Sequence, residues 1–204
     1  IGACFAIEAA SQGFSSFAQR LVLLASLYVT LAVSLNLING ITGQFSIGHA
    51  AFYQVGAYTA GYLSKRFFES QPLAPAAWIP LMLVAGALMA SIAGLVVGLP
   101  SLRLKGDYLA IVTLGFGEII RIVTQNIPYL GGASGFGVKP KATMLWLSWL
   151  LAVLCIAVCR NLLKTAHGLP FLAVREDEVA SAAMGVNTTR TKVTAFVIGS
   201  AFAG

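Results

Sequence analysis

The stretch LVLLASLYVTLAVSLNLING (residues 21–40) has no charged side chain in 20 consecutive positions. An α-helix rises about 1.5 Å per residue, so about 20 apolar residues are needed to cross the hydrocarbon core of a bilayer. Four further apolar stretches of 17 to 24 residues follow, and another apolar run closes the chain. The sequence therefore predicts five membrane spans, 21–40, 46–64, 76–99, 108–127 and 143–159, with a truncated sixth from Val193 onward.

The composition supports a membrane protein. Of 204 residues, 58% are hydrophobic, and only 13 Lys or Arg and 7 Asp or Glu are charged, whereas about a quarter of a soluble domain is charged. An ordinary soluble enzyme, a disordered tail and a disulfide scaffold are excluded. The basic residues are scattered, so the net charge of +6 does not indicate a nucleic-acid partner.

The predicted fold class is all-α: a polytopic transmembrane helical bundle with the lipid bilayer around it. We expect one transmembrane domain over residues 1–204, as a fragment that is incomplete at both ends. Successive spans alternate in direction, which puts the 100–107 and 160–192 loops on one side. That side carries seven Lys or Arg against five on the other, so the positive-inside tendency predicts that 160–192 is cytoplasmic.

A polar stretch, NGITGQFSIGH (residues 39–49), lies between two apolar segments. A plain tight turn is one interpretation. The alternative is a loop that lines a cavity, because irregular backbone at membrane depth is tolerated only inside protein or along a water-filled space. Small residues continue into the next helix and would allow close helix packing in lipid. On the second interpretation, Gln44, Ser46 and His49 are candidates for a substrate path.

Two charged side chains, Glu118 and Arg121, lie inside the predicted span 108–127. Their spacing of three residues places them on one helix face, where they can pair. Ionisable groups inside a membrane are candidates for a functional site, so both are further candidates for the path. A structural ion pair is the plainer interpretation, and a proton relay through Glu118, as in an ion-coupled secondary transporter, is another.

The glycine-rich stretch GGASGFG (residues 131–137) predicts an outer loop. Its Gly-Ala-Ser-Gly superficially matches the nucleophile motif of intramembrane serine proteases. That chemistry needs the serine in the membrane with a histidine on a neighbouring helix. Ser134 instead falls in a polar loop and His167 on the other side, so the sequence does not favour proteolysis, and no catalytic residue is predicted.

Two cysteines, Cys155 and Cys159, share a face of the fifth predicted span. No His or Asp stands near them to complete a tetrahedral metal site. We expect them to pack in the bundle, and no metal site is predicted.

The polar segment HGLPFLAVREDEVASAAMGVN (residues 167–187) predicts one helix of about four turns. Pro170 can begin it, and Gly185 with Asn187 can end it. Three consecutive acids stand in its middle. The segment is either a solvated amphipathic connector or a helix that docks into a groove on a partner.

Several of these stretches together resemble one family: the inner-membrane permeases of ATP-binding-cassette importers for branched-chain amino acids. The likeness is greatest to the permease type with an Arg-Glu-Asp-Glu loop. It spans about residues 21–204, and its motifs fall in the family's order. The matching stretches are 35–60, 102–121, 131–135, 175–187, 195–197 and 201–204.

The resemblance implies that the loop 160–192 is a cytoplasmic coupling loop, whose helix docks on the nucleotide-binding subunit and transmits its movement. The residues at the family's matching positions are Arg175, Glu176, Asp177, Glu178, Ala180 and Gly185.

The resemblance also implies the function: a non-enzymatic permease subunit of a bacterial inner membrane. It would translocate branched-chain or similar amino acids by alternating access. The expected partners are two ATPase subunits, a second related permease and a periplasmic substrate-binding protein. No phosphate-binding Gly-x-x-x-x-Gly-Lys-[Ser/Thr] occurs in the chain, so we expect no cofactor here and ATP on the partner subunits.

Overall fold

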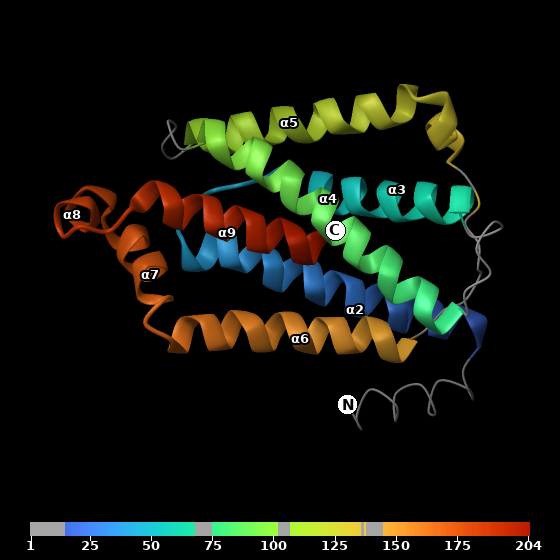
Figure 1. The fold of residues 1–204 in the computed structure, drawn as a ribbon, viewed down its shortest axis with the longest axis horizontal. Helices are drawn as coiled ribbons and strands as arrows, with labels where there is room; N and C mark the ends of the chain where they lie inside the picture. Colours follow the sequence, from blue (N-terminus) through green and yellow to red (C-terminus); the bar gives the residue numbers. More distant parts are fainter. Residues whose placement is uncertain (1–14, 68–74, 102–106, 136, 138–144) are drawn as a thin grey trace.

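The computed structural model describes residues 15–67, 75–101, 107–135, 137 and 145–204, and the regular elements within these ranges are all helical (Figure 1). This agrees with the predicted all-α fold. In chain order they are α2 (Ser16–Asn36), the π-helical turn η1 (Leu37–Ile41), α3 (His49–Phe67), α4 (Pro75–Ser101), α5 (Asp107–Asn126), the 3₁₀ turns η2 (Pro128–Leu130) and η3 (Gly132–Ser134), α6 (Leu145–Lys164), α7 (Leu169–Glu176), α8 (Glu178–Ala183) and α9 (Thr188–Ala203).

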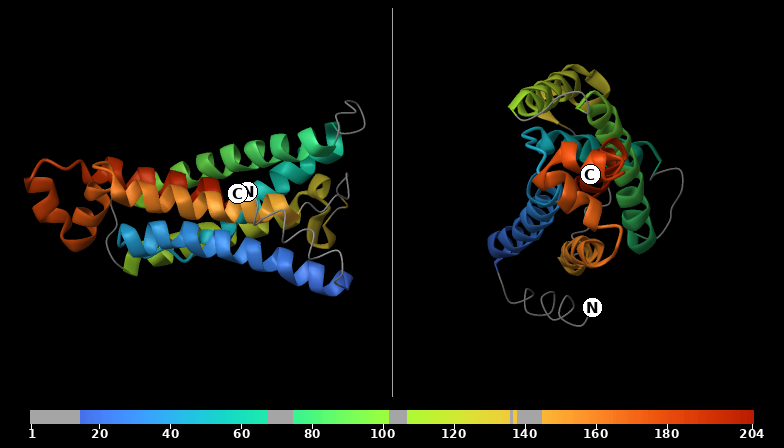
Figure 2. Two further views of the ribbon diagram at one scale, coloured as in Figure 1. Left: turned by 90° about the horizontal axis from the view of Figure 1, so that it is seen from below. Right: turned by 90° about the vertical axis from the view of Figure 1, so that its left-hand side faces the viewer.

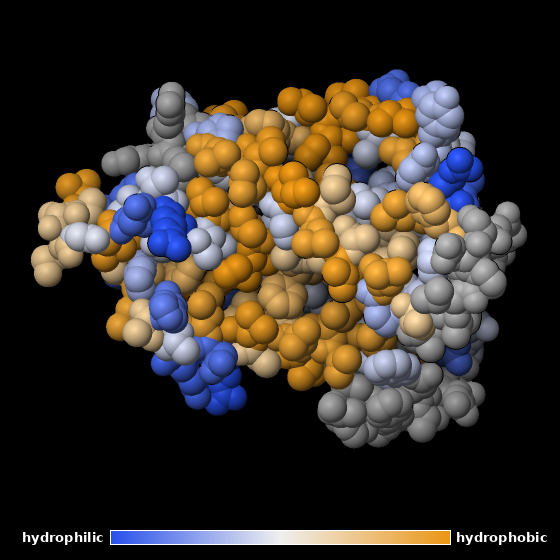
Figure 3. Space-filling view, in the orientation of Figure 1, coloured by the Kyte–Doolittle hydropathy of each residue, from blue (hydrophilic) through white to orange (hydrophobic). Residues whose placement is uncertain are grey.

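Four helices in the described part of the chain are long and apolar enough to cross a membrane. They are α2 with η1, α4, α5 and α6. Each coincides with a predicted span to within a few residues. Many of their large apolar side chains are exposed, among them Leu88, Ile92 and Ile119, as expected of surfaces that face lipid. Space-filling atoms show the result as an apolar band across the middle of the molecule (Figure 3).

The two remaining predicted spans differ from the prediction. Helix α3 begins at His49 rather than at residue 46, and neither α3 nor the 16-residue α9 is among the four span-forming helices. Helix α9 begins at Thr188, five residues earlier than the predicted run, because the Asn187 side chain accepts a hydrogen bond from the Arg190 N–H at 2.9 Å. Of the five full spans and one truncated span that were predicted, four are confirmed as long, apolar helices in the described part of the chain.

Helices α2, α3, α5, α6 and α9 run roughly along one direction and α4 crosses them obliquely, with α5 and α6 at opposite edges of the bundle (Figures 1 and 2). The end of α4 and the start of α5 lie at the same end as α7 and α8, on the left of Figure 1. This placement agrees with the prediction that the 100–107 and 160–192 loops share a side. The turns η2 and η3 lie at the other end.

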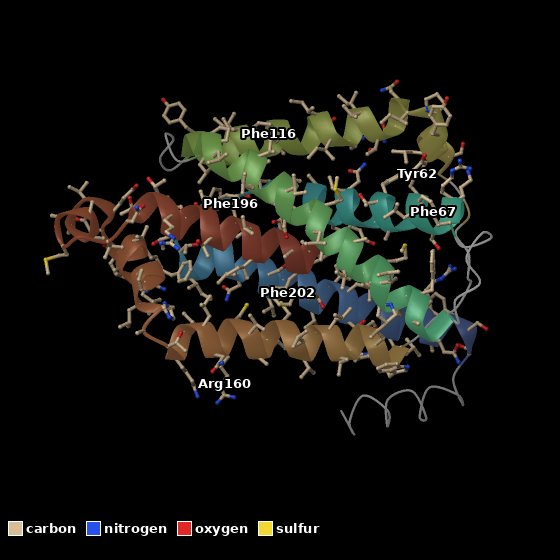
Figure 4. The ribbon with its side chains drawn as sticks, in the orientation of Figure 1. Tyr62, Phe67, Phe116, Arg160, Phe196 and Phe202 are labelled. Carbon is tan, nitrogen blue, oxygen red and sulfur yellow. The ribbon has the colours of Figure 1, made fainter. Side chains whose placement is uncertain are left out.

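Helix α9 occupies the centre and packs against α4, α2 and α3. Its Phe196 is fully buried with Ile38 and Phe52, and Phe116 of α5 packs against the same cluster (Figure 4). Glycines allow the backbones to approach. A Cβ on Gly94 of α4 would overlap the Ser200 side chain and lie 3.0 Å from the Phe196 carbonyl oxygen. Small residues at helix contacts thus determine the spacing of the core, as is usual in lipid.

This packing predicts that Gly94→Ala destabilises the fold. The added methyl group has no room between α4 and α9, and overpacking of this kind should lower the melting temperature of the detergent-solubilised protein by about 5 °C.

Gly115→Ala is the matched control, since a Cβ there meets no atom within 4 Å. Alanine favours a helix over glycine, so Gly115→Ala should keep or raise the melting temperature. Equal melting temperatures for the two variants would contradict the close α4–α9 contact.

Candidate functional site

Residues 42–48 form a non-helical segment between the π-helical turn and α3. The segment runs back along the bundle, so that α3 begins partway along its length (Figure 1). It is therefore more than a tight turn. Buried and exposed positions alternate along it, as in an extended chain whose side chains point to opposite sides. In order, beginning with a buried one, these positions are Thr42, Gly43, Gln44, Phe45, Ser46 and Ile47.

The backbone of this segment is held by specific hydrogen bonds. The Asn39 amide donates to the Ser46 carbonyl oxygen at 3.1 Å and accepts from the Ser46 N–H at 3.2 Å. The Gln44 N–H donates to the Ile38 carbonyl at 3.0 Å, and the Ile47 N–H donates to the Thr113 hydroxyl of α5 at 3.1 Å. Buried backbone groups need such partners, and here two helices supply them.

His49 is the first residue of α3, and its imidazole ring is buried inside the bundle. Its Nε2 lies 2.8 Å from the hydroxyl oxygen of Ser34 on α2, within hydrogen-bond distance. The ring packs edge-on against Phe52, with ring centroids 5.8 Å apart. These contacts fix the orientation of the ring, while its other nitrogen, Nδ1, has no hydrogen-bond partner in the described part of the protein.

Three predicted path residues, Gln44, Ser46 and His49, are each about 5% exposed or less; we call them the polar set. Both amide atoms of Gln44, the Ser46 hydroxyl and Nδ1 of His49 find no partner among the described residues. The great majority of buried polar side-chain atoms in proteins have a hydrogen-bond partner. Together these atoms can donate and accept hydrogen bonds, which suits a small polar ligand or water.

The predicted pair of Glu118 and Arg121 is present on α5. The Arg121 guanidinium donates to both carboxylate oxygens, with Nη2 to Oε1 at 2.5 Å and Nε to Oε2 at 3.0 Å. Both side chains are about half exposed. The structure therefore does not bury this pair with the polar set, although Thr113 of the same helix contacts residues 42–48.

Three residues that bind the polar set or its neighbour Ile47 were not among the predicted site residues: Ser34, Asn39 and Thr113. The available signal was a hydroxyl or amide side chain within a run that is otherwise apolar. Such a signal identifies candidates but not their partners, because Thr113 and Ile47 are 66 positions apart in the sequence.

The prediction of one helix over 170–187 is wrong. Pro170 lies in the first turn of α7, as expected, but the chain breaks at Asp177 and continues as α8. The cause is local: the Asp177 carboxylate accepts from the N–H groups of Val179 at 2.8 Å and Ala180 at 3.0 Å, and so caps a new helix. Gly185, with a φ of +86°, follows the end of α8.

Residues 167–187 are called the coupling segment after the role that the resemblance implies, and each of its three acids has a partner within the chain. Glu176 pairs with Arg175 at 2.6 Å, and Asp177 caps α8. Glu178 pairs with Lys192 of α9 at 2.6 Å, and the Lys192 side chain is only 10% exposed. Reversing all three acids would therefore disturb the fold of this segment as well as any contact with a partner.

Beyond these pairs, α8 projects past the end of the bundle (Figures 1 and 2). Its exposed side chains are small or apolar: Val179 is 68% exposed and Met184, directly after the helix, is 85% exposed. Ala180 is exposed between them. We call residues 179–184 the apolar tip. Of these exposed residues, Ala180 was among the predicted site residues, whereas Val179 and Met184 were not.

An apolar cavity of about 490 Å³ lies between α2, α3, α4, α6 and α9. Among its lining residues only Thr30, Tyr53 and Ser148 carry a polar side chain, and none belongs to the polar set. The cavity suits apolar groups but offers few hydrogen bonds.

The residues of the other sequence-based alternatives are not brought together. Turn η3, which holds Ser134, and the α6–α7 connection, which holds His167, lie at opposite ends of the bundle (Figure 1), so the structure does not favour proteolysis. Cys155 and Cys159 are buried, as expected. Within the described ranges no group of three potential metal ligands occurs.

Comparison with known proteins assigns the family. Residues 17–204 match the family model described as the permease component of the branched-chain amino acid transport system. The chain belongs to this family. No solved structure matches it.

Its relatives include the high-affinity branched-chain amino acid transport system permease proteins LivM of Escherichia coli, 36% identical over 220 residues, and of Salmonella typhimurium, 35% identical over 217. These matches cover 89% and 87% of the chain but 49% and 48% of the relatives. A third relative, a probable LivM of Methanocaldococcus jannaschii, is 28% identical over 211 residues, or 86% of the chain and 61% of the relative. The chain thus spans about half the length of its bacterial relatives.

Proposed function

We propose that this chain is the membrane-spanning part of a permease subunit in an ATP-binding-cassette importer of branched-chain or similar amino acids. The family match and the names of the relatives support the class of protein and the class of substrate. Four span-forming helices support a multi-pass membrane protein, for which we propose a bacterial inner membrane. In this role the subunit is not itself an enzyme.

One observation carries the proposed role in transport: backbone groups of Gln44, Ser46 and Ile47 are paired, whereas four side-chain atoms of the polar set have no partner among the described residues. A free amino acid has a carboxylate and an ammonium group that lose their hydration when they enter a membrane protein. Groups that can both donate and accept hydrogen bonds can replace part of that hydration. We assign the polar set to the polar part of the substrate path.

The apolar tip is the proposed contact with the ATPase subunits. The tip projects from the end of the bundle, and the ion pair of Glu178 with Lys192 joins its helix, α8, to α9. An exposed methionine with small neighbours is typical of a surface that inserts into a groove on a partner. The other proposed partners, a second permease and a periplasmic substrate-binding protein, follow from the family.

Transport by this permease should depend on the Gln44 amide. Gln44→Leu keeps a similar volume and leaves no protein group unpaired, so the fold should stay as stable or become more stable. Uptake of a branched-chain amino acid by cells that carry the complete transporter should fall about tenfold or more, since a lost hydrogen bond to a charged group costs at least about 1.5 kcal/mol.

Asn161→Leu, at an exposed position of α6, makes the same polar-to-apolar change away from the path and should retain uptake. The proposal fails if Gln44→Leu transports as well as the wild type.

Assembly with the ATPase subunits should depend on the apolar tip. Met184→Glu places a charge at the most exposed apolar position of the tip, and burying it against a partner would cost several kcal/mol. Co-purification of the ATPase subunits should then fall about tenfold or more.

Tyr129→Glu is the control, because Tyr129 is 78% exposed in η2 at the other end of the bundle. Retained ATPase binding in Met184→Glu would show that the tip is not the docking surface.

A further inference from the structure

The side chain of Arg175 connects the coupling segment to the non-helical segment 42–48. Its Nη1 donates to the Gly40 carbonyl oxygen in the π-helical turn at 3.3 Å. The same guanidinium holds the Glu176 carboxylate through Nε and Nη2, at 3.0 and 2.6 Å. The arginine is therefore oriented by an acid on its own helix while it reaches the backbone directly before residues 42–48.

The aliphatic part of this side chain lies on Gly43. A Cβ at Gly43 would be 2.8 Å from Cγ of Arg175 and 3.3 Å from its Cα. Gly43 also has a φ of +66°, a conformation that glycine adopts without strain. The glycine thus provides both the turn of the chain and the space for the arginine, one position before Gln44.

Apolar packing and an ion pair also hold α7 and α8 against the bundle. Phe171 of α7 is buried with Leu37 and Ile41 of the π-helical turn in one apolar cluster. Helix α8, beyond the break at Asp177, is tied to α9 by the largely buried ion pair of Glu178 and Lys192. A force on the tip can therefore reach the bundle through α9 and through the π-helical turn. The contact of Arg175 with Gly43 lies within the segment that carries Gln44 and Ser46.

We propose that Arg175 is a positioning residue that transmits movement of the α7–α8 unit to residues 42–48, and thereby to the polar set. This inference rests on the proposed function, since the movement would come from the ATPase subunits. It is narrower than the role implied by resemblance, in which the whole coupling loop docks on the ATPase and transmits its movement, because it assigns the transmission to one side chain and its contact with residues 40 and 43. A docking contact would change assembly, whereas a transmitting contact changes the yield of transport per ATP hydrolysed.

The test uses the complete transporter in liposomes, with its full-length permeases, ATPase subunits and binding protein. Arg175→Ala should retain the co-purified ATPase subunits and their ATP hydrolysis. The ratio of amino acid taken up to ATP hydrolysed should fall about tenfold. Arg175→Lys, which keeps a donor that can reach the Gly40 carbonyl, should restore part of that ratio.

Arg190→Ala is the matched control, because it removes an exposed arginine at the start of α9, at the same end of the bundle. The ratio should stay near that of the wild type. An unchanged ratio in Arg175→Ala, or a loss of ATPase subunits in parallel with uptake, would contradict the inference. A wild-type transporter without ATP-driven uptake would instead contradict the proposed function itself.

A second variant tests the same contact from the other side. Gly43→Ala should displace the Arg175 side chain and lower the ratio in the same way. Gly135→Ala controls for backbone strain, because Gly135 also has a positive φ, +69°, but a Cβ there meets nothing within 4 Å. Equal ratios in Gly43→Ala and Gly135→Ala would contradict the role of the contact.

Movement of the segment can be measured directly at Phe45, which is 54% exposed. In a transporter whose native cysteines are replaced, the labelling rate of Phe45→Cys by a maleimide should change about threefold or more when ATP is added. Adding Arg175→Ala should abolish that response. A response that survives Arg175→Ala would overturn the inference.

Discussion

Inside a membrane protein every backbone N–H and C=O must find a partner, and this constraint acts most strongly on residues 42–48. The segment lies next to span-forming helices but is not itself helical. The Asn39 amide binds both backbone groups of Ser46, and Thr113 binds the N–H of Ile47. Because these partners exist, the chain can turn back at the π-helical turn and begin α3 inside the bundle.

In the same segment, backbone groups have hydrogen-bond partners while buried polar side-chain atoms lack them. Each buried polar group without a partner costs about 1–3 kcal/mol, and Gln44, Ser46 and His49 together leave four atoms without a protein partner in the described ranges. A purely structural loop would gain stability from apolar side chains at these positions. The cost is understandable if a polar ligand or water forms hydrogen bonds with these atoms during transport. In the proposed mechanism, Arg175 transmits movement of the coupling segment to them through its contacts with Gly40 and Gly43.

Much of the fold could be predicted from sequence, because hydropathy alone located α2, α4, α5 and α6. The pairing of Glu118 with Arg121 was also predictable, since helical spacing determines it. The break at Asp177 was missed because a side chain of one residue competes with the helix for two N–H groups. Contacts between distant positions, such as Glu178 with Lys192 and Arg175 with Gly40, depend on how the helices pack and leave no periodic signal.

The most direct test of this account is an experimental structure of the complete transporter with a branched-chain amino acid trapped in the permease. The account predicts that the carboxylate or ammonium group of the amino acid lies within hydrogen-bond distance of Gln44, Ser46 or His49, beside residues 42–48. An amino acid bound elsewhere, with these side chains satisfied by protein groups alone, would contradict it.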